Sequence, residues 1–226
     1  MNVFSGPQSL QEYSQFSIFP VEYRIISKYF NSFGSMLELG CGCGRVTISL
    51  RDICPNVIAV DIVPEMIEIA NDLVTGVNFR LMSACELEFD SESFDYVIFA
   101  YNGIDYIYPE AKREICLDEV YRVLKPGGIF VFSTHNRLCI KNYLPTNRFR
   151  ISNLMLNIKN KRIFRQYRLE RHPDGNLETY ATTPFQQRKL LKKHGFKDVK
   201  IYGQKYDNIF FTTFIDTWSY YVCFRR

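Results

Sequence analysis

Residues Met36–Arg45 read M-L-E-L-G-C-G-C-G-R, and this stretch decides the fold. A short apolar strand with one acid, Glu38, runs into glycines at alternate positions, Gly40, Gly42 and Gly44, and then into a helical segment. Glycine makes such a tight turn without strain and lets a ligand approach the backbone, because it has no Cβ. The stretch therefore predicts a nucleotide-like ligand at a strand-to-helix turn of a doubly wound α/β sheet.

The spacing of the glycines separates two kinds of ligand. A dinucleotide fingerprint, G-x-G-x-x-G, requires glycine at position 45, which is Arg45 in this chain. The acid before the first glycine, Glu38, would repel a pyrophosphate and suits a cationic ligand. Both features argue against a nicotinamide oxidoreductase.

A second strand ends in an acid at the spacing that a nucleoside site requires. Asp61 closes the apolar run 57–60 and lies 19 residues after Gly42. A carboxylate there can accept hydrogen bonds from both hydroxyls of a ribose. Ile62 and Met66 follow and are placed to cover an adenine ring.

Five motifs in order resemble those of the class I S-adenosylmethionine-dependent methyltransferases, over about residues 30–135. They are E-x-G-x-G-x-G (38–44), Asp61, the run that ends at Ser83, S-F-D-x-V (93–97) and K-P-G-G (125–128). The resemblance implies a Rossmann-like, doubly wound sheet of seven strands, mostly parallel with an antiparallel last strand. It also implies S-adenosylmethionine as the cofactor. This sequence departs from the family at one point: the acid that the family often has near Ser83, and that holds the adenine amino group, is absent.

The resemblance assigns the cofactor contacts along these motifs. Glu38 and the glycine turn would hold the methionine end, and Asp61 the ribose. The expected cofactor-binding residues are Glu38, Gly40, Cys41, Gly42, Gly44, Asp61, Ile62, Met66, Ser83, Ala84, Cys85 and Tyr101.

The acceptor would lie just past the fourth and fifth strands. His135 is the first candidate for a general base because its ordinary pKa lies near 6.5; the alternative is that it only satisfies backbone groups. Asp105 is a second candidate, as a base or as a partner for an ammonium group. The expected catalytic residues are thus His135, Asp105 and Tyr101, and the expected substrate-binding residues are Tyr13, Asn102, Tyr106 and Asn136.

Bulk composition points to an ordinary protein of the cytoplasm. The chain has 226 residues, of which 46% are hydrophobic and 23% charged. It shows no signal peptide and no apolar run of the ~20 residues that span a bilayer. Its 7 cysteines are odd in number and scattered, which favours free thiols over disulfides, and their spacing favours no metal site.

Two segments flank the motif region. Residues 1–33 are expected to be helical, interrupted at Pro20, and either pack on the sheet or form a lid with Tyr13 and Tyr23 facing the pocket. Residues 137–183 are expected to be an insertion over the substrate cleft, with a β-hairpin formed by 163–169 and 177–182.

The insertion is strongly basic. Residues 137–171 hold ten lysines and arginines against one acid, Glu170, whereas the whole chain has a net charge of +4. Three interpretations remain open: a solvated surface, attraction of an anionic small-molecule acceptor, or contact with RNA. The last would use the aromatic residues interleaved with the cations, namely Tyr143, Phe149, Phe164 and Tyr167.

The sequence thus predicts one domain over residues 1–226, monomeric or homodimeric, that methylates an oxygen or nitrogen of a small molecule. The alternatives are an RNA methyltransferase and a catalytically silent cofactor-binding partner of another methyltransferase.

Overall fold

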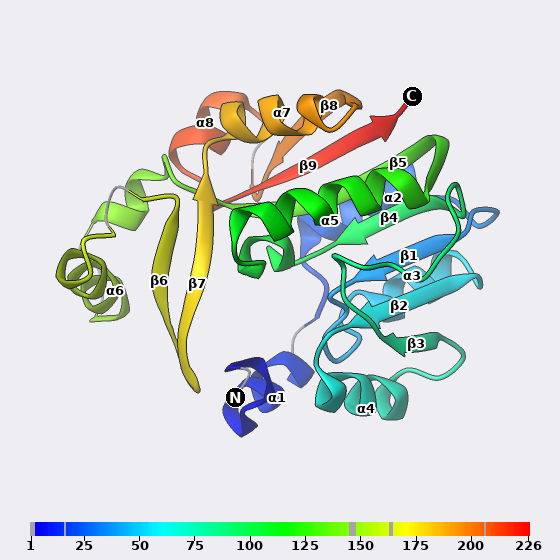
Figure 1. Ribbon diagram of the computed structural model, residues 1–226, viewed down its shortest axis with the longest axis horizontal. Coiled ribbons are helices and arrows are strands. Elements are labelled where there is room, and N and C mark those ends of the chain that lie inside the picture. The colour runs from blue at the N-terminus through cyan, green and yellow to red at the C-terminus, as the bar shows by residue number, and fades with distance from the viewer. Residues whose placement is uncertain (1–2, 16, 145–147, 163–164, 206) are drawn as a thin grey trace.

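A twisted sheet of nine strands runs through the part of the chain that the computed structural model describes, residues 3–15, 17–144, 148–162, 165–205 and 207–226 (Figure 1). The strands are β1 (Met36–Leu39), β2 (Val57–Asp61), β3 (Asn78–Leu81), β4 (Phe94–Phe99), β5 (Leu124–Asn136), β6 (Tyr167–His172), β7 (Gly175–Thr182), β8 (Phe196–Gly203) and β9 (Trp218–Arg225).

The sheet contains the predicted seven-stranded core. Strands β3, β2, β1, β4 and β5 lie side by side in that order, and all four pairs are parallel. Strand β9 runs antiparallel beside β5, and β8 pairs with the far side of β9. The prediction of a mostly parallel Rossmann-like sheet with an antiparallel last strand is confirmed. The hairpin β6–β7 adds two strands, because the end of β5 pairs with β7 at His135 and Asn136.

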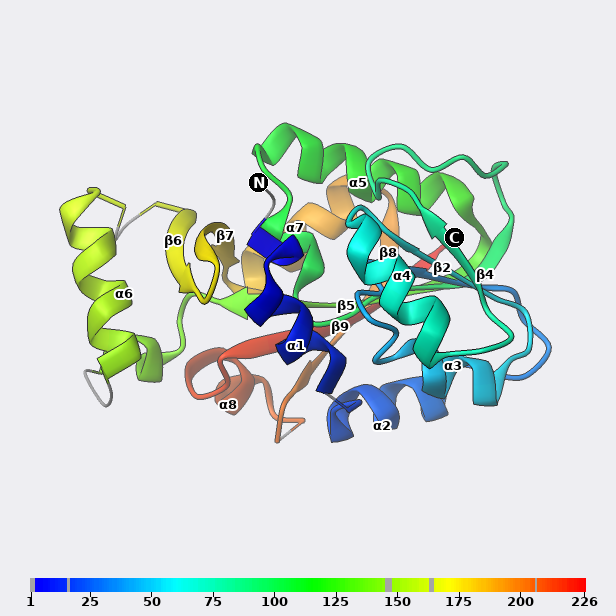
Figure 2. The ribbon, with the colours of Figure 1, turned by 90° about the horizontal axis from the view of Figure 1, so that it is seen from below.

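Helices cover both faces of the sheet. They are α1 (Pro7–Gln15), α2 (Pro20–Tyr29), α3 (Thr47–Ile53), α4 (Pro64–Leu73), α5 (Glu110–Val123), α6 (Arg148–Lys159), α7 (Pro184–Lys193) and α8 (Ile209–Phe214), with short 3₁₀ turns η1 (Val3–Ser5), η2 (Gly103–Tyr106) and η3 (Ile140–Tyr143). Figure 2 shows α5 and α7 on one face and α2 and α3 on the other.

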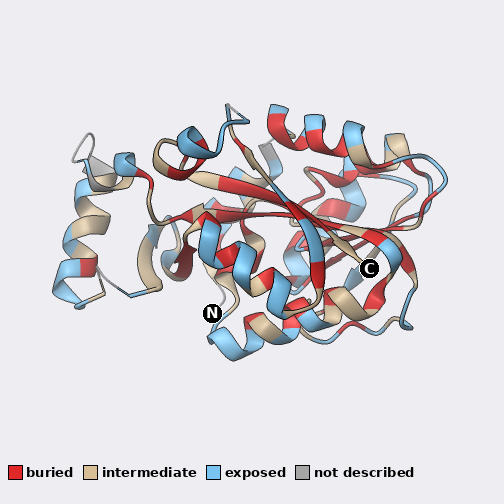
Figure 3. Cartoon of the chain, turned by 90° about the horizontal axis from the view of Figure 1, so that it is seen from above, coloured by how far each residue is buried: buried red, intermediate tan, exposed pale blue. Residues whose placement is uncertain are grey.

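The core follows the alternation of side chains along the strands. Leu37 and Leu39 of β1 pack in the apolar cluster that contains Leu117 of α5, whereas Met36 points to the cluster that contains Ile26 of α2. Strand β1 is buried at all four positions, and the buried residues run along the centre of the sheet (Figure 3). The glycine turn therefore starts from a rigid strand.

The N-terminal segment divides into two parts with different roles. Helix α2 packs on the core, whereas residues 3–15, here called the cover segment, lie between α4 and the tip of the hairpin (Figure 2). Asp174 in the hairpin turn accepts hydrogen bonds from Ser9, from its backbone nitrogen at 2.8 Å and its Oγ at 2.5 Å. The predicted break at Pro20 is confirmed. Tyr23, expected to face a pocket, is 58% exposed on α2.

The insertion differs in detail from the sequence prediction. The first hairpin strand, expected at 163–169, is β6 at Tyr167–His172, and residues 163 and 164, with the aromatic Phe164, lie outside the described residues. Helix α6 was not predicted, because its apolar residues are interleaved with arginine and asparagine. Asn157 on this helix bonds both backbone groups of Leu169, at 2.8 and 2.9 Å, and so joins α6 to β6.

In the part of the chain that the structure describes, no helix is both long and apolar enough to cross a lipid bilayer.

Candidate functional site

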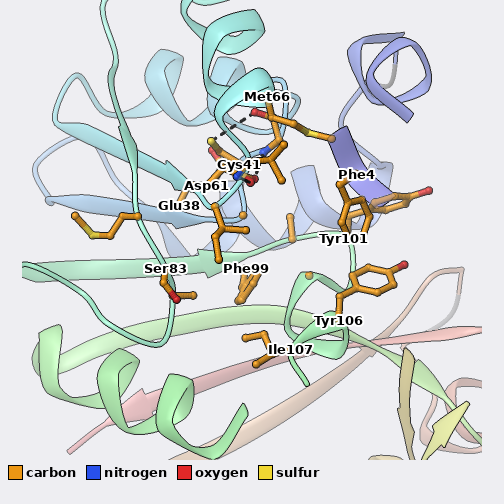
Figure 4. A pocket seen from close by; sticks show the side chains of 18 of the residues that line it. Phe4, Glu38, Cys41, Asp61, Met66, Ser83, Phe99, Tyr101, Tyr106 and Ile107 are labelled. Atoms are coloured by element: carbon orange, nitrogen blue, oxygen red, sulfur yellow. Dashed lines mark hydrogen bonds between the residues drawn. The ribbon is translucent and has the colours of Figure 1, made fainter. Parts of the chain in front are cut away.

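A cavity of about 570 Å³ opens at the carboxyl ends of β1, β2 and β4. Its size is that of a small-molecule site. Figure 4 shows Glu38, Cys41 and Asp61 on one side, Ser83 at one end, and Phe4, Tyr101 and Tyr106 at the other end. Of the cofactor-binding residues that the sequence predicts, all but Gly44 line this cavity.

The glycine turn has the conformation that the sequence requires. Gly40 and Gly42 have φ angles of +59° and +55°, which L side chains rarely adopt. A Cβ on Gly40 would lie 2.6 Å from the ring of Phe99. Gly44 also has a positive φ, +86°, and a Cβ there would lie 2.9 Å from Val74, so the third glycine lets the turn pack against the end of α4.

Asp61 is held by the backbone of both turns. Its carboxylate accepts hydrogen bonds from Gly42 N at 2.8 Å and from Val63 N at 3.0 Å. The side chain is buried on the wall of the cavity. These two bonds orient the carboxylate, and its remaining lone pairs face the cavity for a pair of hydroxyl donors.

Glu38 is buried at the end of β1 and lines the cavity. It accepts a hydrogen bond from Thr47 Oγ1 at 2.5 Å. Burial raises the pKa of Glu38 to about 8, although the Thr47 hydroxyl and nearby Arg45 lower it. A cation bound beside this carboxyl group would relieve the cost of ionising it.

The opposite end of the cavity is formed by the loop after β3. Ser83, Ala84 and Cys85 line it as predicted, and Ser83 Oγ accepts a hydrogen bond from Cys85 N at 3.1 Å. The sequence analysis missed Glu86 and Lys112, which also line this cavity. Glu86 could have been found, since it is an acid three residues after the position where the resembled family has one.

Four aromatic rings close the other end, and we call Phe4, Tyr13, Tyr101 and Tyr106 the aromatic wall. The ring centroids lie 5.8 Å apart for Tyr13 and Tyr101, 6.0 Å for Phe4 and Tyr13, and 5.1 Å for Phe4 and Tyr106. Phe4 was missed by the sequence analysis because nothing local marks it. The three tyrosines were predicted, and all three line the cavity.

Tyr101 has a strained backbone. Its φ angle is +51° and that of Asn102 is +59°, a conformation that costs ~1–3 kcal/mol for such residues. The hydrogen bond from Asn102 N to Ser133 Oγ at 2.8 Å holds the loop in place. Asn102 itself is buried and does not line the cavity. The strain therefore directs Tyr101, not Asn102, into the site.

Asp105 and His135 lie together behind the aromatic wall. Asp105 is fully buried, and its Oδ2 lies 2.9 Å from His135 Nδ1 and accepts a hydrogen bond from His135 N at 2.6 Å. The His135 ring lies 5.9 Å from the ring of Tyr106. Burial lowers the pKa of His135, but the carboxylates of Asp105 and Glu170 raise it by more than burial lowers it, so the net shift of this pKa is upward. Neither residue lines the cavity as the structure describes it.

Asn136, predicted to bind substrate, is instead a buried structural residue. Its Nδ2 lies 2.8–3.0 Å from the carbonyl oxygens of Thr212, Thr213 and Asp216. It holds the segment that leads from α8 into β9.

Arg45 is neutralised inside the site. Its guanidinium group forms two hydrogen bonds with the carboxylate of Glu22, at 2.5 and 2.9 Å, and both side chains are less than a tenth exposed. The same group lies 5.3 Å from the centroid of the Tyr101 ring. The ion pair joins α2 to the glycine turn.

Replacing Glu22 by alanine leaves Arg45 charged and buried without its carboxylate partner. We expect the Glu22→Ala variant to lose ~3–5 kcal/mol of unfolding free energy, measured by urea denaturation. Asp207→Ala is the matched control, because Asp207 bonds Arg24 in a pair that is nearly half exposed and should cost ~1 kcal/mol or less. Equal losses in the two variants would contradict the argument.

Comparison with known proteins agrees with this geometry. Residues 36–128 match the model of a family described as a methyltransferase domain. The chain is 31% identical over 116 residues to a carboxy-S-adenosyl-L-methionine synthase of Hydrogenovibrio crunogenus, which covers 48% of this chain and 45% of that protein. It is 29% identical over 216 residues to an uncharacterized protein of Methanocaldococcus jannaschii, which covers 90% and 80%. The chain spans about half the length of several other curated relatives.

Solved structures share the fold over nearly the whole chain. A S-adenosylmethionine-dependent methyltransferase of Methanosarcina mazei superposes with a TM-score of 0.68 at 20% identity, covering 93% of this chain and 99% of that one. The family match, the relatives and the shared fold agree with the motifs and the cavity. The chain thus resembles the S-adenosylmethionine-dependent methyltransferases in its motif region, residues 36–128, and in its fold.

Proposed function

We propose that the protein transfers the methyl group of S-adenosylmethionine to a nitrogen or oxygen of a small molecule. One observation carries the proposal: Glu38, Asp61 and the Ser83–Cys85 loop line the same cavity whose other end is the aromatic wall. In this proposal, Glu38 and the glycine turn hold the methionine end of the cofactor, and Asp61 holds the ribose. The adenine lies between Met66 and the Ser83–Cys85 loop.

The cofactor supplies a methyl group on a sulfonium, which is an excellent leaving group. The protein's task is then to hold the nucleophile in line with that methyl group, an effect worth up to ~7–11 kcal/mol. Tyr101, Tyr106 and Tyr13 lie where the acceptor would meet the cofactor. The cover segment helps to exclude water, since Phe4 and Tyr13 pack against Met66.

We propose that Asp105 and His135 act as a positioning pair for the aromatic wall. Their hydrogen bond fixes the ring of His135 against Tyr106. If the acceptor has to lose a proton, His135 is the nearest imidazole behind the wall.

The proposal also concerns the setting in which the protein works. All seven cysteines are free, and six are buried or nearly so, which suits the reducing cytoplasm. Within the described residues, no basic side chain of the insertion lines the cavity. This favours a small molecule over RNA as the acceptor.

Binding and turnover are tested separately. In a calorimeter, we expect S-adenosylhomocysteine to bind and NAD not to bind. In a turnover assay with S-adenosylmethionine labelled in its methyl group, we expect the label to appear in one member of a metabolite panel. Binding without any transfer would favour a silent partner subunit. Absence of binding would refute the proposed function.

Asp61→Asn removes the charge that would accept the ribose hydroxyls but keeps the size of the side chain. Two charge-assisted hydrogen bonds weaken, so we expect the affinity for S-adenosylhomocysteine to fall by about 10–100-fold. Asp72→Asn, on the exposed side of α4, is the matched control and should bind as the unaltered protein does. Undiminished affinity in Asp61→Asn would place the ribose elsewhere.

The affinity for S-adenosylhomocysteine should depend on pH through Glu38. In the free protein the pKa of Glu38 is about 8, and the ammonium group of the ligand would lower it, so binding releases a proton. Affinity then rises as the pH rises from 6 to 8, approaching about tenfold per unit. Calorimetry in buffers of different ionisation enthalpy measures the released proton.

Glu38→Gln should abolish this dependence, because the amide does not titrate. Glu65→Gln, an exposed position on α4, should keep it. A dependence that survives in Glu38→Gln would assign the proton to another group.

A further inference from the structure

The described cations of residues 137–171 lie away from the cavity, whereas the one acid of that stretch lies near the aromatic wall. The ten cations of residues 137–171 do not line the cavity anywhere in the described part of the chain. Two residues of the hairpin lie near the aromatic wall: His172, whose ring contacts those of Phe4 and Tyr13, and Glu170, the one acid of residues 137–171, which lies beside His135. The Oε2 of Glu170 lies 3.9 Å from His135 Nε2 and accepts a hydrogen bond from Thr179 Oγ1 at 3.3 Å. The hairpin therefore brings a carboxylate toward the site, although residues 137–171 as a whole are strongly basic.

The cations that do line the cavity are directed elsewhere. Arg45 is paired twice with Glu22. Lys112 lies at the opposite end beside Cys85, since its backbone carbonyl accepts a hydrogen bond from the Cys85 thiol, and burial raises the pKa of that thiol while the charge of Lys112 acts to lower it. Behind the wall, Arg113 lies 3.9 Å from Asp105 and stacks on the ring of Tyr180 at 4.1 Å. It offsets the charge of Asp105 and leaves that of Glu170.

The tyrosines of the wall also report a negative surrounding. The pKa values of Tyr13, Tyr101 and Tyr106 are all raised, mainly by burial. After burial, Glu12 of the cover segment and Glu170 of the hairpin contribute to the rise for Tyr13 and Tyr101. The three phenols are therefore neutral at physiological pH, and they offer aromatic faces and hydroxyl groups rather than charge.

This combination matches a cationic group. Aromatic rings attract a cation that lies within about 6 Å of their centroids, and a carboxylate nearby supplies the opposite charge. An anionic acceptor, one alternative that the sequence left open, would meet no unpaired cation among the described residues at the aromatic wall, because Arg45 is paired with Glu22 and Lys112 lies beside Cys85. Resting on the proposed function, we propose that the acceptor is an amine, bound at the aromatic wall with Glu170 as its countercharge.

Charge moves in the same direction during the transfer. An amine that arrives as an ammonium ion first releases a proton to solvent, because only the neutral amine has the lone pair that attacks the methyl group. The nitrogen lone pair then forms the new N–C bond, and the electrons of the broken S–C bond stay on sulfur. Positive charge leaves sulfur and develops on nitrogen, beside the rings and Glu170, so the wall stabilises the transition state as well as the product.

Three probes with head groups of the same shape, trimethylammonium or tert-butyl, test the acceptor class on the full chain saturated with S-adenosylhomocysteine. They are choline, its neutral isostere 3,3-dimethyl-1-butanol, and the anion 3,3-dimethylbutyrate. In an NMR titration, we expect choline to bind at least about tenfold more tightly than the alcohol. We expect 3,3-dimethylbutyrate to bind most weakly of the three. Equal binding of choline and the alcohol, or preference for the anion, would overturn the proposal.

Variants locate the charge. Glu170→Gln should lower the affinity for choline about tenfold and leave that for the alcohol unchanged. Glu178→Gln is the matched control on the same hairpin, because Glu178 pairs with Arg162 and should bind choline as before. If the two variants behave alike while their thermal midpoints match the parent, Glu170 is not the countercharge.

The two proposals fail in different ways. Loss of S-adenosylhomocysteine binding in the parent protein refutes the methyl-transfer function itself. Binding of S-adenosylhomocysteine without a preference for choline refutes only the amine acceptor.

Discussion

The cavity depends on one carboxylate, that of Asp61, and on its two backbone donors. Gly42 N belongs to the turn after β1 and Val63 N to the turn after β2, so a single side chain ties together two strand ends. The bonds are possible because Gly42 adopts a left-handed φ and turns its N–H toward the neighbouring strand. Without these two hydrogen bonds, the positions of the two turns on the cavity wall would not be fixed relative to each other.

Asp61 also influences the electrostatics of the neighbouring residues of the cavity. Glu38 and Asp61 are buried near each other, and the charge of Asp61 contributes to the raised pKa of Glu38. Arg45, the nearest cation, is already occupied by Glu22. Among the described residues, the centre of the cavity therefore has no unpaired cation, and the carboxylate of Glu170 lies beside His135 behind the aromatic wall. A sulfonium nucleoside and an amine acceptor would both supply what the protein leaves out.

Much of this site could be predicted from sequence because it is set by local backbone chemistry. The glycine turn, Asp61 and the Ser83–Cys85 loop each follow directly from a strand end, where residue type and spacing determine the geometry. Gly44, Asn102 and Asn136 were predicted at the same kind of position but do not line the cavity. The direction of a side chain just past a strand depends on contacts with distant elements, such as Ser133 for Asn102 and the segment after α8 for Asn136.

Other parts could not be read from the sequence because they depend on tertiary contacts. Phe4 reaches the aromatic wall only because the cover segment crosses the molecule. Helix α6 lacks a clear apolar stripe and is held to β6 by asparagine side chains. The proposed role of Glu170 could not be predicted from its segment, which holds ten basic residues. The net charge of a segment does not tell which of its charged side chains lies next to a cavity.

The bonds between Asp174 and Ser9 join the first residues of the described chain to an insertion about 165 positions later. The cover segment supplies Phe4 and Tyr13 of the aromatic wall, and both rings contact His172 of the hairpin. Under the proposed function, acceptor choice would thus be a joint property of two regions outside the matched domain, residues 36–128. A chimera that exchanged only one of them with a relative would inherit half of a recognition surface, so the two must be transplanted as a unit.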